Sequence, residues 1–239
     1  MIAVFRSELL KLRTTRTAVV LALGLYAISV IAIVGSLIVS DSLDESTQAD
    51  LPSSAGFAVL FAILFGILVM TGEYRHGTAT PTFLATPQRE RVLIAKSLAA
   101  AIGGLTLALS ALVLVYVVAV PWLLVTGESV LLFERDPLRG ALGLIAASAI
   151  WGALGVGVGA VVRSQVGAMI GTLVWFLIAE PLVGHLLSGV SPYLPGAALG
   201  TIFEASEDLS SWAGAAISLG YAASFCLVGT ILTVRRDIT

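Results

Sequence analysis

The sequence predicts an all-α, polytopic membrane protein with six transmembrane helices and both termini in the cytoplasm. Three observations support this prediction. Hydrophobic residues make up 58% of the chain and charged residues only 12%, whereas about a quarter of the residues in a soluble domain are charged. The charges fall in short clusters that separate six long uncharged stretches. Lys and Arg gather in every second cluster, which is the pattern expected of cytoplasmic loops.

Each uncharged stretch is long enough to cross a hydrocarbon core about 30 Å thick, because a helix rises about 1.5 Å per residue. Helices are expected because lipid cannot satisfy free backbone N–H and C=O groups, and the alternating pattern of a membrane barrel is absent. The stretches are 17–40, 55–72, 97–125, 141–162, 165–187 and 212–234. The first exceeds the length of a secretory signal core, and no A-x-A cleavage site follows it, so we expect a retained anchor.

The distribution of Lys and Arg predicts the orientation. Eleven of the thirteen basic residues lie on one predicted side, and cytoplasmic loops carry such an excess. These residues are Arg6, Lys11, Arg13, Arg16, Arg75, Arg89, Arg91, Lys96, Arg163, Arg235 and Arg236. The opposite loops carry mainly acids, with Arg135 and Arg139 as their only bases. We therefore expect one transmembrane domain, composed of 1–239, with a cytoplasmic interfacial segment at 1–16, a cytoplasmic loop at 73–96 and an extracytoplasmic segment at 188–211.

The N-terminal segment has two interpretations. Phe5, Leu9 and Leu12 fall on one helical face, which suits a helix that lies in the headgroup layer and leads into the first span. Alternatively, the basic residues of the segment act only as a positive-inside anchor.

The cytoplasmic loop at 73–96 contains two predicted helix starts. Thr80-Pro81 and Thr86-Pro87 each pair an N-cap hydroxyl with a proline at the first helical position. The first pair predicts a short helix that ends before the second pair, since a proline disfavours helical geometry in the preceding residue. The second predicts a helix that begins at Pro87 and continues into the third span. A short helix held below the membrane is a docking element for a soluble partner.

The same loop resembles a known family. The run E-Y-R-H-G-T, followed by T-F-L-A-T-P-x-R-x-R-V-x-x-A-K, is similar to the loop between spans two and three of ABC type-2 transporter permeases, the membrane subunits of ATP-driven exporters. Four further segments match that family in order and spacing over nearly the whole chain. They are E-L-L-K-L-R-T-T-R before span one, G-A-L-G-V-G-V-G-A-V-V-R-S-Q around spans four and five, Glu180-Pro181, and Y-L-P-G-A-A from Tyr193 to Ala198.

The resemblance implies a permease subunit that forms the translocation path of an exporter in the plasma (inner) membrane of a bacterium. In the family, the loop helix inserts into a groove on a separate ATPase subunit. We therefore expect cytoplasmic ABC ATPase subunits and a second permease subunit, identical or similar, as partners, together with membrane lipid but no nucleic acid. The residues that the resemblance assigns to ATPase coupling are Gly77, Thr78, Thr80, Pro81, Thr82, Phe83, Leu84, Arg89, Arg91 and Lys96.

Four of these residues have a further interpretation. Gly77 is suited to end the second span in a left-handed cap. The three bases Arg89, Arg91 and Lys96 can also serve simply as positive-inside anchors.

The chain itself is not expected to be an enzyme. A P-loop needs a glycine-rich turn that ends in Gly-Lys-Ser/Thr, so that backbone amides and the lysine hold phosphates. Neither Lys96, which Ala95 precedes, nor Lys11 fits this pattern. His76 and His185 fall on opposite predicted sides, and no H-E-x-x-H or G-x-S-x-G motif occurs. We expect no catalytic residue, metal or cofactor in this chain, and ATP and magnesium on the partner subunits.

Glu180 is the one acid deep within an apolar stretch, and Pro181 is expected to break its helix. Intramembrane ionisable residues are costly and are functional candidates by default. The alternative is that the fifth span ends near Ile178, which leaves Glu180 in the outer interfacial layer. In the resembled family the segment after span five is re-entrant, and the prolines and glycines after it suit short broken helices. By this resemblance, the candidate residues of an outer gate or pathway are Glu180, Pro181 and Pro195.

Two GxxxG pairs predict close helix packing. They are Gly155 with Gly159 in span four, and Gly167 with Gly171 in span five. Small faces let helices approach closely in lipid, and we expect both pairs to pack within the bundle rather than in a dimer.

Two other classes of protein remain open. A secondary transporter would show repeated halves and charged midplane sites, and no clear internal repeat is present. A non-transporting membrane scaffold or immunity protein would use the same bundle for binding only.

Overall fold

The computed structural model describes residues 5, 7–8, 16–40, 43–75, 77, 88–204, 206 and 208–235, and every regular element in this part of the chain is helical. Six helical segments are long and apolar enough to cross a membrane. They are Thr17–Val39, Glu45–Arg75, Glu90–Thr126, Arg135–Val162, Gln165–Leu186 and Ser211–Thr233. In the described residues, the prediction of six helices long and apolar enough to cross a membrane is therefore confirmed, while the cytoplasmic placement of the termini stays a prediction.

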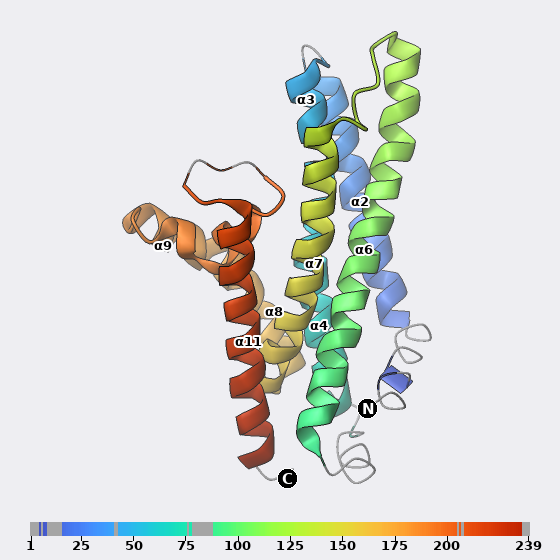
Figure 1. Ribbon diagram of the computed structural model, residues 1–239. Coiled ribbons are helices and arrows are strands. Elements are labelled where there is room, and N and C mark those ends of the chain that lie inside the picture. The colour runs from blue at the N-terminus through green and yellow to red at the C-terminus, as the bar shows by residue number, and fades with distance from the viewer. Residues whose placement is uncertain are drawn as a thin grey trace.

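Long helices stand side by side and form a tall bundle, and several short helices lie at one flank (Figure 1). In chain order the elements are α2 (Arg16–Val39), α3 (Glu45–Asp50), the 3-10 helix η1 (Leu51–Ala55), α4 (Phe57–Arg75), α6 (Arg89–Thr126), α7 (Arg135–Val162), α8 (Gln165–Val174), the π-helical turn η2 (Trp175–Ala179), α9 (Glu180–Leu186), the 3-10 helix η3 (Ser191–Tyr193), α10 (Pro195–Gly200) and α11 (Ser211–Arg235).

Helix α7 is the centre of the bundle, because it packs against α4, α6 and α11. Its small residues allow this close approach. A methyl group added at Gly155 would collide with the backbone of Ile63 on α4, and one added at Gly152 would collide with Ala100 on α6. Gly159 lies against Met70 of α4. The prediction that the first GxxxG pair packs inside the bundle is confirmed.

The prediction for the second GxxxG pair is wrong. Gly167 and Gly171 are exposed on α8, and a methyl group added at Gly171 would meet open space. The reason is that α8 buries a different face, which carries Ala168 and Thr172, against the bundle. Spacing alone does not decide which face of a helix meets its neighbours.

Both ends of the loop at 73–96 are described. Helix α4 ends at Arg75, and Gly77 follows with φ +66°, which confirms the predicted left-handed glycine. Helix α6 begins at Arg89 instead of Pro87, because Gln88 has a non-helical ψ of 82°. It then continues without a break into the third span, as predicted. The short helix predicted after Thr80 lies outside the described residues, as does most of the predicted interfacial segment 1–16.

The predicted break at Pro181 is present as a π-helical turn and a change of direction, and the chain stays helical through it. The helix of span five continues past Ile178, through the π-helical turn, to Leu186. Proline has no N–H and its ring clashes with the carbonyl four residues earlier. The turn before Pro181 accommodates this by widening, and the N–H of Glu180 bonds to the carbonyl of Trp175. Helix α9 therefore leaves the direction of the bundle and projects sideways (Figure 1).

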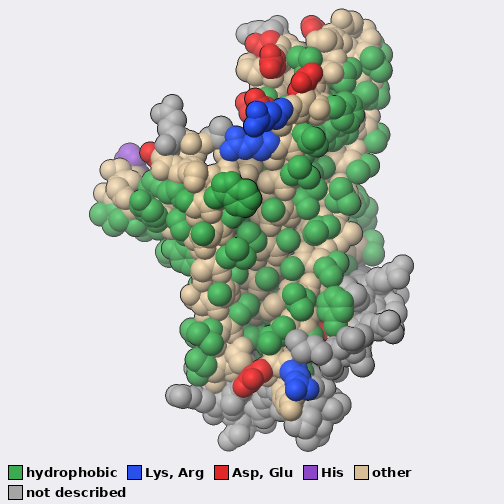
Figure 2. All heavy atoms as spheres, viewed as in Figure 1, with side chains coloured by type: hydrophobic (Ala, Val, Ile, Leu, Met, Phe, Trp, Pro, Cys, Tyr) green, Lys and Arg blue, Asp and Glu red, His purple; other side chains and the backbone are tan. Residues whose placement is uncertain are grey.

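The two ends of the bundle differ in charge. At the basic end, the Arg75 Nη1 atom lies 3.3 Å from Gln165 Oε1, and Arg163 Nη2 lies 2.9 Å from the carbonyl of Leu232, so these loops meet there. At the opposite, acidic end, Figure 2 shows acidic side chains gathered beside two groups of basic atoms, with apolar side chains along the length between the ends. The segregation of charge along the sequence thus becomes a segregation in space.

Candidate functional site

A buried group of charges lies at the basic end. Lys96, near the start of α6, is only 1% exposed. Its Nζ atom lies 2.8 Å from Glu8 Oε2 and 2.8 Å from Glu73 Oε1. Glu8 and Glu73 are 2% and 8% exposed. We call these three residues the ion triad.

Burial of these charged groups carries a large desolvation cost. Taking an ammonium group out of water costs several kcal/mol, and the cost is offset only by close, well-aligned partners. The two short N–H to carboxylate bonds of Lys96 are of the strong, charge-assisted kind. Lys96 is therefore held by protein, and its burial does not fit the interpretation of a lysine that reaches lipid headgroups.

The ion triad closes the base of the loop at 73–96. Glu73 lies near the end of α4, before the loop, and Lys96 lies near the start of α6, after it. Glu8 belongs to the N-terminal segment that precedes α2. Three separate parts of the chain thus meet at one ammonium group.

The sequence-predicted coupling residues have different positions. Arg91 and Gly77 are exposed, while Lys96 is buried. The backbone of Arg89 is helical. The remaining predicted residues lie outside the described part of the chain: they are Thr78, Thr80, Pro81, Thr82, Phe83 and Leu84.

Sequence reasoning missed Glu8 and Glu73. Both are acids on a predicted side that is otherwise rich in bases. That exception was the available signal, because an acid beside an apolar span needs a partner when it is buried.

Arg163 joins three helices at the basic end. It ends α7 with φ 57°, in the left-handed region that few non-glycine residues adopt. Besides its bond to Leu232 on α11, its guanidinium lies 5.7 Å from the ring centre of Tyr74 on α4. Such contacts of a cation with an aromatic face are attractive. The ends of α4, α7 and α11 are therefore tied together.

The second candidate group surrounds Glu180. This residue is 7% exposed. Its Oε2 atom accepts a hydrogen bond from Trp175 Nε1 at 3.0 Å, and its Oε1 atom accepts one from the backbone N–H of Ala197 at 2.8 Å. We call these three residues the Glu180 cap.

The Glu180 cap satisfies the start of helix α10. The first N–H groups of any helix lack partners within it, and α10 has no side-chain cap of its own. A carboxyl group near a helix N-terminus is also favoured by the helix dipole. Gly196 lies close against the Glu180 carboxyl, so a methyl group added there would displace the carboxyl from its hydrogen bonds.

The predicted gate residues come together in this region. Pro195 occupies the first position of α10, where its missing N–H has no cost. Pro181 lines a groove of about 710 Å³ together with Glu180, and the groove also borders α4 and α7. Sequence spacing had placed Glu180 and Pro195 in separate segments, and the fold brings them to one site.

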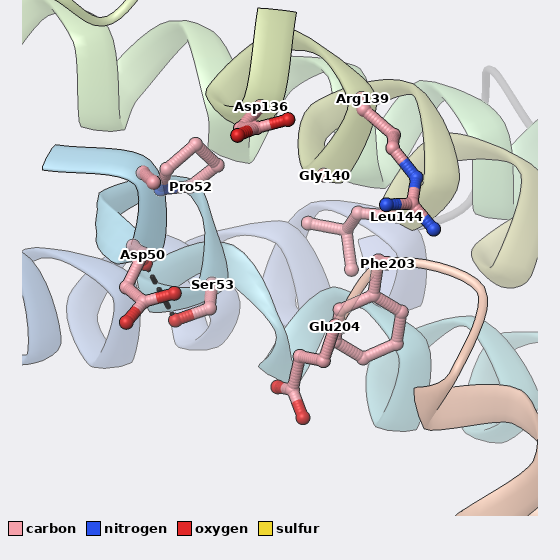
Figure 3. A pocket seen from close by; sticks show the side chains of 10 residues that line it. Asp50, Pro52, Ser53, Asp136, Arg139, Gly140, Leu144, Phe203 and Glu204 are labelled. Atoms are coloured by element: carbon pink, nitrogen blue, oxygen red, sulfur yellow. Dashed lines mark hydrogen bonds between the residues drawn. The ribbon is translucent and has the colours of Figure 1, made fainter. Parts of the chain in front are cut away.

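An acidic pocket adjoins this groove. It has a volume of about 230 Å³ and contains Asp50, Asp136, Arg139 and Glu204 (Figure 3). Arg139 Nη2 donates to the Ser211 hydroxyl at 2.8 Å. The side chain of Glu204 remains exposed, and its pKa is raised above the ordinary glutamate value, first by partial desolvation at the pocket wall and second by the nearby charge of Asp50. The pocket is therefore a locally negative site at the acidic end.

Comparison of the sequence with models of known protein families and with curated proteins finds no match.

Proposed function

We propose that this chain is the membrane-spanning permease subunit of an ABC-type exporter. It pairs with a second permease subunit, forms the translocation path, and receives force from separate ATPase subunits through the loop at 73–96. The observation that carries the proposal is that the two helices flanking this loop are in direct contact at its base. Its two flanking helices, α4 and α6, are joined by a buried ion pair 2.8 Å long between Glu73 and Lys96.

The ion pair between α4 and α6 supports a coupling role of the loop for a physical reason. A loop that transmits force needs rigid attachment to its flanking helices. If the attachment is flexible, the loop moves without moving the helices. Helix α6 is 38 residues long and continues from the loop through the third span, so movement of its start displaces the whole helix. ATP would drive the change only if the ATPases bind the two membrane conformations with different affinity.

Two further features support the proposed assembly. Helix α8 exposes an apolar face with the small residues Gly167 and Gly171, and such faces pack well against other membrane helices. This face is the proposed contact with the second permease subunit. At the acidic end, the short helices held by the Glu180 cap border the groove and form the proposed outer gate.

Orientation can be tested with introduced cysteines. The single native cysteine is first removed by Cys226→Ser, and Arg91→Cys or Glu134→Cys is then added. Both positions are exposed and lie at opposite ends of the bundle. A membrane-impermeant thiol reagent added to intact cells should label only Glu134→Cys. Labelling of Arg91→Cys from outside would contradict the proposal.

The partnership is tested by purifying the tagged chain from its native membranes. We expect a P-loop ATPase to co-purify, and its ATP hydrolysis to respond to the permease. The pair Arg89→Glu and Arg91→Glu should uncouple hydrolysis from transport and leave membrane insertion intact. The control is Arg135→Glu, which reverses an exposed base at the other end that lines neither the acidic pocket nor the groove. Absence of any ATPase, or an equal effect of Arg135→Glu, would contradict the proposal.

A further inference from the structure

The ion triad joins parts of the chain that the proposed function leaves separate. Lys96 Nζ contacts Glu73 from α4 and Glu8 from the N-terminal segment at equal distances of 2.8 Å. Helix α2, which follows the N-terminal segment, packs against both α4 and α6. Glu8 of the N-terminal segment, α4 and α6 therefore meet at the basic end on one buried ammonium group.

Stability alone does not explain why these residues are charged. An apolar set of similar volume is often as stable as a buried ion pair, because the ions lose their hydration. What charge adds is specificity: an ammonium group that is hydrogen-bonded to two carboxylates fixes the relative positions of three backbones, whereas apolar side chains can slide. The best-attested role of buried polar groups is the fixing of register.

The ion triad lies at the base of the proposed coupling loop, where the register between α4 and α6 determines how the two helices move with the loop. Glu73 lies on α4 and Lys96 on α6, at the two ends of the proposed coupling loop 73–96. Both helices continue into predicted spans. Any displacement of the loop must therefore either move α4 and α6 together or break the contacts of Lys96.

We infer that Glu8, Glu73 and Lys96 are positioning residues that lock the N-terminal segment, α4 and α6 into one rigid unit, so that force on the loop moves the first three spans together. The lock itself is a property of the chain alone. Its use in coupling rests on the proposed function.

The decisive variant is the triple substitution Glu8→Gln, Glu73→Gln and Lys96→Met. It removes the three charges together, so that neither carboxylate keeps its charge after losing the ammonium group, and the protein is expected to fold. The matched control is Gln48→Met at the acidic end. Gln48 is fully buried and its side chain makes three hydrogen bonds. Its substitution therefore tests whether the loss of any buried polar contacts accelerates hydrogen exchange throughout the protein.

The first measurement needs no ATPase. Hydrogen exchange of the purified full chain in lipid nanodiscs reports local opening. In the triple variant, the end of α4 and the start of α6 should exchange about tenfold faster, with the first turns of α7 unchanged. Gln48→Met should not accelerate exchange at the basic end. Unchanged exchange at α4 and α6 in the triple variant would overturn the lock.

The second measurement uses the complex with the co-purified ATPase. The triple variant should still bind the ATPase, while the permease-dependent change in hydrolysis falls about tenfold. Lys96→Arg, which keeps a cation between the carboxylates, should retain more of the response than Lys96→Met. Full coupling in the triple variant would overturn the positioning role. If the wild-type chain binds no ATPase, the proposed function fails, and the exchange experiment still decides whether the lock exists.

Discussion

The two ends of the bundle both bury acidic side chains, and they satisfy them in different ways. At the basic end, Glu8 and Glu73 are held by the full charge of Lys96. At the other end, Glu180 is held by neutral donors, an indole N–H and a backbone N–H. The comparison teaches that a buried acid in a membrane protein can serve as an ionic joint between long helices or as a cap for a short one.

The difference has mechanical consequences. The ion triad connects segments that each continue into a span, so its contacts resist relative movement of whole helices. The Glu180 cap connects a π-helical turn to a six-residue helix, and it can open with a much smaller rearrangement. The first arrangement suits transmission of force, and the second suits a movable cover.

The largest expected effect comes from Lys96→Met alone. It deletes the ammonium group that both Glu8 and Glu73 contact, and breaking a buried ion pair typically costs about 3–5 kcal/mol. The free energy of unfolding, measured by denaturant titration of the purified protein in detergent, should fall by that amount. A loss no greater than that of Lys96→Arg would show that charge is unimportant at this position.

Glu180→Gln should have an intermediate effect. A glutamine keeps the shape but replaces one acceptor oxygen by an NH₂ group, so one of the donors from Trp175 and Ala197 faces another donor. An unsatisfied buried donor costs about 1–3 kcal/mol. We expect that decrease in the free energy of unfolding, together with faster hydrogen exchange in α10. Equal protection of α10 in both proteins would remove Glu180 as its cap.

Trp175→Phe is expected to lower the free energy of unfolding by a smaller amount than Glu180→Gln. It keeps an aromatic ring in the π-helical turn but deletes the N–H that Glu180 accepts, and a typical hydrogen bond contributes about 1 kcal/mol. The loss should therefore be smaller than that of Glu180→Gln. In the double variant the two losses should not add, because both act on the same contact.

The smallest effect is the pH dependence that Glu204 introduces at the acidic end. Its raised pKa means that the folded chain binds this proton more tightly than the unfolded chain. The stabilisation is fully present below the ordinary glutamate pKa and is lost as the pH rises through the elevated folded value. Glu204→Gln should flatten this part of the curve of stability against pH. A curve identical to that of the wild type would assign the slope to other groups.

Much of the fold could be predicted from local sequence. The six spans followed from uncharged length, and the left-handed Gly77 followed from its place after an apolar helix. The contacts of Gly155 and Gly159 also agreed with prediction. These features depend on a residue and its near neighbours, or on the solvent around the helix.

Other features could not be predicted, because they depend on which helix faces meet. Gly167 and Gly171 have the same spacing as the first pair, yet they point away from the bundle. The helix continues past Pro181 because the turn before it is widened, with the Glu180 N–H bonded to the carbonyl of Trp175. The partners of Lys96 lie 88 and 23 residues away along the chain, and no local pattern links them.

The sequence by itself determined that this chain forms six apolar helices with most bases in alternate connecting segments, because hydrophobicity and charge act on each residue through the surrounding solvent. Only the tertiary structure decided that Lys96 is locked between two carboxylates and that Glu180 caps a helix seventeen residues further on. Those outcomes require side chains from distant segments to arrive at one point, and the packing of α4, α6 and α7 determines where that point lies.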